Sequence, residues 1–294
     1  MLAGGEGRYG SISLYLFRAF IQSKEARLAI MYPFIISVPH GGTIVPQEVS
    51  DRVGLSPGEV TFYSDPGTRE IFNFRPRVAA FIDTAVSRVV VDLNRPPYHL
   101  APKYPDGAIK SITGFGTPVY RDDRFPDINL VHRLMVKYFF PYHEQIDRLT
   151  DEKKVRIAFD CHSMLPQALP DKVEQGRSRP LICLGNNGDM NGAPRPGILS
   201  TCPQGLIQEL AQHFRSEFGN ESAVLINRPY AGGFISISHR WHRDIPWVQI
   251  EVNRGLYERE TNGPDQPGYI DKSAAKELNG RIWGVLSSFW DNTA

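Results

Sequence analysis

The stretch FIISVPHGG, residues 34–42, joins a short apolar run to a polar loop that carries His40. A run rich in Ile, Val and Phe that stops at a Pro-Gly segment predicts a buried strand. Similar runs follow along the chain, and segments with helical spacing lie between them. We predict further strands at 79–83, 88–93, 155–160, 180–185 and 247–252, and helices at 66–74, 126–149, 204–218 and 271–289. This alternation predicts an α/β domain with a mainly parallel sheet that is covered on both faces.

Composition sets the class of protein. The chain has 294 residues, of which 41% are hydrophobic and 22% charged, and its net charge is +1. The balance of charge gives no support for a nucleic-acid partner, and no 18-residue apolar run supports a membrane span. We expect one domain over residues 31–294, preceded by an extension, residues 1–30, in which residues 11–30 have helical spacing. Three scattered cysteines favour a reducing, cytoplasmic location.

Polar residues collect where the predicted strands end. His40 follows the first run, Asn94 and Arg95 follow 88–93, and His162 follows 155–160. In open α/β sheets, ligands bind at the carboxyl ends of the strands. We therefore expect these side chains to converge on one edge of the sheet.

His40 and His162 are the predicted ligands of one zinc ion, because imidazole is a common zinc ligand and catalytic zinc sites use three protein ligands. The alternative for each is a histidine that caps a turn. We expect Asp65 to be the third ligand, with Glu70 as the other choice, although Asp65 could simply cap a helix. Asp160 could orient a histidine ring from behind.

Glu251 lies within an otherwise apolar strand, where a carboxylate needs a partner or a function. We predict a general base beside the metal; the alternative is a buried ion pair with an arginine. Arg95 and Arg254 suit a substrate carboxylate, unless each forms a structural salt bridge with a nearby acid such as Asp92.

Weaker expectations concern the flanks of this site. Gly232 and Gly233, after Tyr230, would allow the backbone to approach the substrate closely, or would form a plain turn. We expect His143 to support the site from behind or to pack within its helix. Cys161 adjoins His162, but neighbours on a strand face opposite ways, so it should be a buried filler rather than a nucleophile. Two further histidines, His239 and His242, are expected on a loop.

Six motifs together resemble one family. They are SVPHGG at 37–42, DLNRPP at 92–97, PYH at 141–143, DCHS at 160–163, NRPYAGG at 227–233 and QIEVNRGLY at 249–257. In this order they resemble the N-formylglutamate amidohydrolase family over residues 34–290. The resemblance implies a fold related to the zinc carboxypeptidases, namely a three-layer α/β/α domain with a mixed, mainly parallel central sheet.

The resemblance also implies roles for particular residues. His40 and His162 would bind zinc, and Glu251 would be the general base. Asn94 and Arg95 would hold the substrate carboxylate or polarise the scissile carbonyl. Thr43 stands where the carboxypeptidases have a glutamate ligand, and for this reason Asp65 is the substitute.

The resulting hypothesis is zinc-dependent hydrolysis of an N-acyl amino acid, first of all N-formyl-L-glutamate to formate and L-glutamate. Another divalent metal could replace zinc, and the partner would be a small molecule with a carboxylate. Two alternatives remain: a related amidase acting on another N-acyl amino acid or a cell-wall peptide, and a non-catalytic domain that binds an acidic metabolite.

Overall fold

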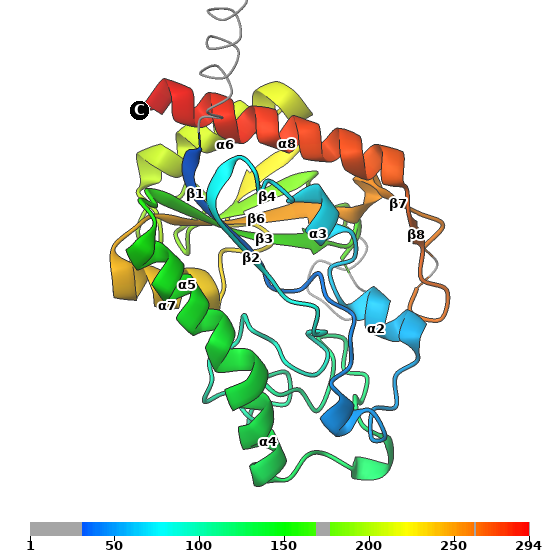
Figure 1. The fold of residues 1–294 in the computed structure, drawn as a ribbon. Coiled ribbons are helices and arrows are strands. Elements are labelled where there is room, and N and C mark those ends of the chain that lie inside the picture. The colour runs from blue at the N-terminus through cyan, green and yellow to red at the C-terminus, as the bar shows by residue number, and fades with distance from the viewer. Residues whose placement is uncertain (1–30, 169–176, 262, 294) are drawn as a thin grey trace, which may run out of the picture.

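A mixed sheet lies at the centre of the molecule (Figure 1). The computed structural model describes residues 31–168, 177–261 and 263–293, and within them six strands form this sheet in the order β2-β1-β3-β6-β4-β5. Its strands are β1 (Tyr32–Val38), β2 (Val78–Asp83), β3 (Ile157–Met164), β4 (Ile182–Gly185), β5 (Val224–Ile226) and β6 (Trp247–Asn253). The first four strands in the order are parallel, whereas β4 runs antiparallel to β6 and parallel to β5. The predicted mixed, mainly parallel sheet is confirmed. The predicted extension, residues 1–30, lies outside the described residues.

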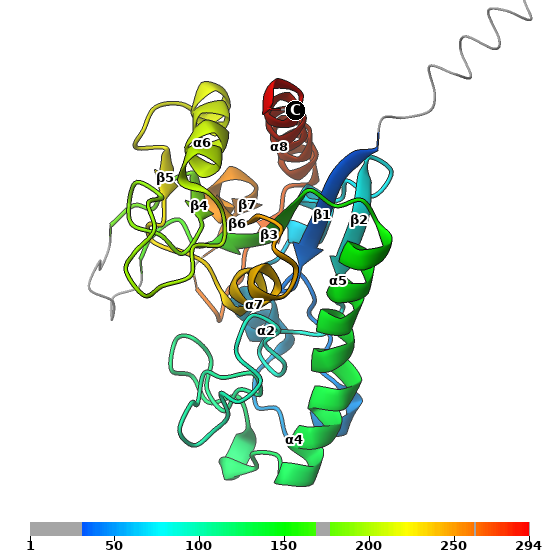
Figure 2. The same ribbon diagram turned by 90° about the vertical axis from the view of Figure 1, so that its left-hand side faces the viewer.

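Helices cover both faces of the sheet (Figure 2). One face carries α3 (Thr68–Ile71), α6 (Gln204–Phe218) and α8 (Lys272–Thr293), and the other carries α5 (Phe140–Glu152) and α7 (Phe234–Arg243). Alternate residues of each strand supply the two cores, because successive side chains on a strand point to opposite faces. Phe34 and Ile36 belong to the α6–α8 core, whereas Ile35 belongs to the α5–α7 core. The predicted three-layer α/β/α architecture is confirmed.

Shorter elements complete the chain. They are α2 (Pro57–Tyr63), α4 (Ile128–Leu134), the hairpin of β7 (Glu258–Arg259) and β8 (Tyr269–Ile270), and 3₁₀ turns at Gln47–Val49, Arg121–Asp123 and Arg254–Leu256. The helix predicted over 126–149 is observed as α4 and α5, joined by a π-helical segment, Met135–Phe139. This segment lies just before Pro141, whose missing N–H cannot continue the regular hydrogen-bond ladder. The last helix begins after Asp271, whose carboxylate caps it by accepting from the Ser273 and Ala274 N–H groups.

Two predicted segments are wrong. Residues 88–93 form turns instead of a strand, with a single bridge from Val91 to Ile109. Their valines are buried in the α5–α7 core. The apolar run therefore reflects the burial of these turns and not pairing in the sheet. His239 and His242 lie on helix α7 rather than on a loop. Asn94, which is distant in sequence, holds the first turn of this helix by accepting from the Ile235 N–H, a signal that local sequence does not contain.

The cysteines and helices bear on two further expectations. Cys161, Cys183 and Cys202 are all free and buried, and Cys161 packs in the α6–α8 core on the face opposite to His162, as predicted. None of the described helices combines the length and the apolar character that crossing a bilayer needs. The cytoplasmic location stays a prediction.

Candidate active site

A cavity of about 350 Å³ opens at the carboxyl ends of β1, β3 and β6. Its floor consists of polar side chains from the α5–α7 face of the sheet, where the period-two alternation of the strands places them. His162 of β3 lies beside Glu251 of β6 in the parallel register. The opposite face of these strands contributes apolar residues to the α6–α8 core.

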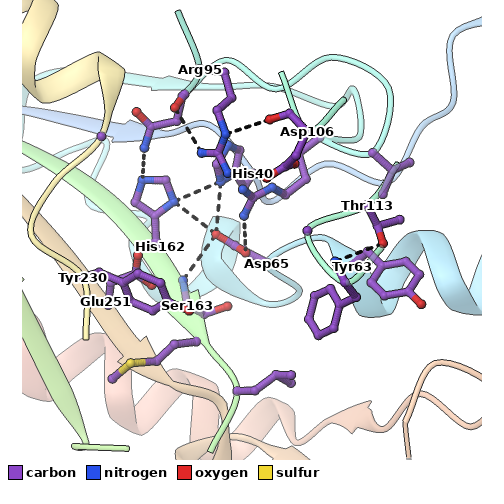
Figure 3. A pocket seen from close by; sticks show the side chains of 18 of the residues that line it. His40, Tyr63, Asp65, Arg95, Asp106, Thr113, His162, Ser163, Tyr230 and Glu251 are labelled. Atoms are coloured by element: carbon purple, nitrogen blue, oxygen red, sulfur yellow. Dashed lines mark hydrogen bonds and ion pairs between the residues drawn. The ribbon is translucent and has the colours of Figure 1, made fainter. Parts of the chain in front are cut away.

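Three side chains converge at the base of the cavity (Figure 3). The Nδ1 atoms of His40 and His162 lie 3.1 Å apart, and Asp65 Oδ2 lies 3.2 Å from His162 Nδ1 and 3.5 Å from His40 Nδ1. All three residues are buried. His40 follows β1, His162 belongs to β3, and Asp65 follows α2, where its N–H donates to the His40 carbonyl at 2.9 Å. Among the residues that the structure describes, this is the one cluster of ligand atoms that could hold a metal ion.

In each histidine ring, the outer nitrogen, Nε2, has its own hydrogen-bond partner, and this partner determines whether the inner nitrogen, Nδ1, has a lone pair for a metal ion. Asp92 Oδ1 lies 2.7 Å from His40 Nε2, and Asp160 Oδ2 lies 3.0 Å from His162 Nε2. A carboxylate accepts, so each Nε2 carries a proton. When the rings are neutral, as metal ligands are, both Nδ1 atoms present lone pairs to each other and to the Asp65 carboxylate. Three converging acceptor atoms match a bound cation, and carboxylate-backed histidines are typical of metal sites.

The pKa shifts show that the buried imidazole and carboxylate groups stabilise one another's charged forms. Burial alone would lower the pKa of His162, but the charge of Asp160 and hydrogen bonds with Asp160 and Asp65 raise it well above its usual value. Burial would raise the pKa of Asp65, but hydrogen bonds with His162 and His40 hold it well below its usual range. The cluster therefore attracts positive charge, which a proton or a metal ion can supply.

Glu251 faces the same cavity from β6 (Figure 3). Its Oε1 accepts a hydrogen bond of 2.8 Å from Gln249 Nε2, so its partner is an amide and not the arginine of the alternative interpretation. Burial raises the pKa of Glu251 to about 7. A carboxyl group with a pKa near neutrality can both take and return a proton.

Asn94 is held between the sheet and α7. Its Nδ2 donates to Asp160 Oδ2 at 3.2 Å, and its Oδ1 accepts from the Ile235 N–H at 2.8 Å. A Cβ on Gly233 would lie 2.3 Å from Asn94 Nδ2, so this position requires glycine because of Asn94. Gly232 has φ +145° and lines the cavity, together with Gly233 and Tyr230.

The two predicted arginines occupy different positions. Arg95 lines the cavity, is about one-third exposed, and pairs with Asp106 at 2.9 Å. Arg254 also lines the cavity but is buried, and it donates to the Phe62 and Ser64 carbonyls and to Ser163 Oγ. Its guanidinium lies 3.6 Å from Asp65, so it braces the loop that carries this residue.

The structure also separates the alternatives for the third ligand. Glu70 is exposed on α3 and lies outside the cavity, and Thr43 is exposed as well. Asp65 is the carboxylate that meets both histidines.

Several lining residues escaped sequence reasoning. Arg88 and Lys110 both reach Asp92, at 3.0 and 2.9 Å, and so stabilise the carboxylate behind His40. The spacing of Arg88 and Asp92, four residues apart, could have suggested the first pair. Gln249 shares a strand face with Glu251, and a period-two reading would have found it. Arg179 lines the cavity beside Tyr230, but it has no motif around it.

The fold and the converging groups define an α/β/α protein with a buried His-Asp-His cluster that could hold a metal. The model of one family, described as N-formylglutamate amidohydrolase, matches residues 32–258. The chain belongs to the N-formylglutamate amidohydrolase family, and so to a family of amide hydrolases.

Two solved structures share its fold. The N-formylglutamate amidohydrolase from Ralstonia eutropha JMP134 aligns with TM-score 0.69 and 20% identity, over 90% of this chain and 96% of that one. A gene product of Agrobacterium tumefaciens aligns with TM-score 0.61 and 16% identity, over 90% of this chain and 92% of that one. No curated protein sequence matches the chain.

Proposed function

We propose that this protein is a metal-dependent amidohydrolase that cleaves N-acyl amino acids, with N-formyl-L-glutamate as its first substrate. The observation that carries the proposal is the convergence of two imidazole Nδ1 atoms and one carboxylate oxygen, beside Glu251 in one cavity. The family supplies the reaction class. A cavity of about 350 Å³ suits a small molecule as the partner, rather than a macromolecule.

His40, Asp65 and His162 would hold the metal, for which we propose zinc, since two imidazoles and a carboxylate are a typical zinc ligand set. When bound, the ion would lower the pKa of a water molecule and polarise the scissile carbonyl.

Glu251 performs the proton transfers. Its carboxylate takes a proton from the attacking water as the C–O bond forms, and it returns that proton to the nitrogen as the C–N bond breaks. The products are formate and the free amino acid. Gln249 fixes one carboxylate oxygen through its amide, which leaves the other oxygen for the water.

Cationic side chains suit the substrate's negative charge. Arg95 and Lys110 line the cavity, and both pair with Asp106. Because Arg95 is partly exposed at this wall, we propose that it receives a substrate carboxylate, as its planar group allows. The N–H groups of Arg254 already donate to backbone carbonyls. We propose that Arg254 affects the substrate only by holding the loop that carries Asp65.

The test combines metal content with activity. We expect the purified protein to bind one zinc ion, to release formate from N-formyl-L-glutamate, and to lose activity when a chelator removes the ion. The Glu251→Gln variant should keep its zinc and lose at least about 100-fold in kcat. Glu144→Gln, a neutralised glutamate exposed on α5, is the control and should match the wild type.

Two results would overturn the proposal: full activity without metal, or full activity in Glu251→Gln. A panel of N-acetyl, N-formyl and peptide substrates separates the proposed enzyme from a relative with another amide substrate. Zinc binding without cleavage of any of them would favour a non-catalytic binding domain.

A further inference from the structure

The cations that line the cavity differ in whether an acid already neutralises them. Arg88, Arg95, Lys110 and Arg254 each lie within 3.6 Å of a carboxylate oxygen of the protein. Arg179 is the exception: within residues 31–168, 177–261 and 263–293, no carboxylate pairs with it. Its Nε is buried and has no hydrogen-bond partner there. A buried guanidinium nitrogen without an acceptor is costly, and a bound anion would satisfy it.

The backbone holds Arg179 firmly in place at the cavity wall. Its N–H donates to the Pro166 carbonyl at 2.9 Å, and its carbonyl accepts at 3.3 Å from the Nδ2 of Asn253, the last residue of β6. Two anchors on neighbouring segments fix where the side chain starts, so the guanidinium is presented from a rigid base.

Tyr230 then directs the guanidinium. The Arg179 Cζ lies 5.2 Å from the centroid of the Tyr230 ring, and both side chains line the cavity. An arginine that lies over an aromatic face keeps the N–H groups at its edge available for a planar acceptor. A carboxylate is such an acceptor.

The charges of Glu251 and Arg179 both act on Tyr230. Burial raises the pKa of Tyr230, the charge of Glu251 adds to this shift, and the charge of Arg179 opposes it. Arg95, which we propose as receptor for one substrate carboxylate, pairs with Asp106 on the loop that follows residue 94. An N-acyl derivative of an acidic amino acid has two carboxylates, and Arg95 and Arg179 line the cavity from separate segments of the chain.

We propose that Arg179 receives the side-chain carboxylate of the substrate and so makes the enzyme select N-formyl derivatives of acidic amino acids over neutral ones. This inference rests on the proposed function and names a determinant of its specificity. Arg179 here binds the substrate and takes no part in the proton transfers.

The experiment compares two substrates that differ in one group. N-formyl-L-glutamate and N-formyl-L-glutamine have nearly the same shape, but only the first has a charged side chain. We expect kcat/KM of the zinc-loaded wild type to favour the glutamate derivative. In Arg179→Gln, kcat/KM should fall about 100-fold for the glutamate derivative, mainly through KM, and less than about threefold for the glutamine derivative.

Two further variants make the result specific. Arg179→Lys keeps the charge without the planar fork and should recover part of the preference. Arg177→Gln removes an exposed charge two residues away and should leave the ratio of the two substrates unchanged.

An equal loss on both substrates, or no loss on either, would overturn the role of Arg179 while leaving the amidohydrolase intact. If the zinc-loaded wild type cleaves neither substrate, the proposed function fails and this inference fails with it.

Discussion

The molecule contains two pairs of closely spaced histidines, one fully buried and one partly buried, whose surroundings differ. In the cavity, His40 Nδ1 and His162 Nδ1 lie 3.1 Å apart, and between α5 and α7, His143 Nδ1 and His239 Nε2 lie 2.9 Å apart. The difference lies in what the other nitrogen of each ring meets. Both outer nitrogens of the cavity pair face carboxylates, and this leaves two lone pairs pointing inward.

The second pair meets a carbonyl on one side and a carboxylate on the other. His143 Nε2 donates to the Leu93 carbonyl at 3.1 Å, and His239 Nδ1 lies 2.9 Å from Asp147 Oδ1. Among the described residues, no third ligand atom converges on this pair. Burial, together with the charge of His239, lowers the pKa of His143 to about 3, which keeps this ring neutral. The outward partners of two histidines thus decide between a cation site and a structural link.

Removing one histidine from each pair should give the largest contrast. We expect His162→Ala to lose zinc and to lower kcat/KM more than about 100-fold, because a ligand matters more than its outer partner. His143→Ala should keep the zinc. Metal analysis of both purified variants, with activity on N-formyl-L-glutamate, is the measurement. Equal zinc in the two variants would remove the distinction between the pairs.

A smaller effect should follow from removing the charge of Asp160, the carboxylate that contacts His162 on the side away from the proposed metal. Asp160→Asn keeps the size of a side chain that meets His162 Nε2, Ser37 Oγ and Asn94 Nδ2. Loss of the carboxylate should lower zinc affinity by about 10- to 100-fold, as for other outer-sphere partners. Competition with a chelator measures this affinity. Ser37→Ala, which removes one hydrogen bond to Asp160 without changing charge, is the control and should lose much less.

The same type of change in the second pair should affect stability and not metal binding. In Asp147→Asn, His239 loses a charged acceptor, so the free energy of unfolding should fall by about 1–3 kcal/mol while the zinc content stays constant. Glu144→Gln, on the exposed face of the same helix, should stay within about 0.5 kcal/mol of the wild type. Urea denaturation measures both variants. A fall in zinc content without a change in stability would contradict the structural role.

The sequence predicted five of the six sheet strands because each contains an apolar run, and it missed the three-residue β5. It placed polar residues after those runs, and the fold brings His40, His162 and Glu251 to one cavity. It preferred Asp65 to Glu70 as the third ligand, but both lie near the same short helix, and only the fold shows that Glu70 is exposed to solvent. The valines of 88–93 resembled a strand because buried turns favour the same apolar residue types. Arg179 and the partners of Arg254 depend on contacts between distant segments, which no local pattern contains.

The last prediction concerns how the free energy of unfolding varies with pH. The pKa of His143 is lower in the folded protein than its value near 6.5 in the unfolded chain. Below pH 6.5 the unfolded chain therefore binds a proton at this ring, whereas the folded protein does not. Stability that is present above pH 6.5 is therefore lost as the pH falls toward 3, at up to about 1.4 kcal/mol per pH unit. In His143→Gln this contribution disappears. Urea denaturation between pH 7 and pH 5 should therefore give a shallower slope of unfolding free energy against pH than in the wild type.

His132→Gln, which removes an exposed histidine on α4, is the control and should keep the wild-type slope. Equal slopes for wild type and His143→Gln would mean that the ring takes up a proton in the folded protein, and the contrast between the two histidine pairs would lose its basis.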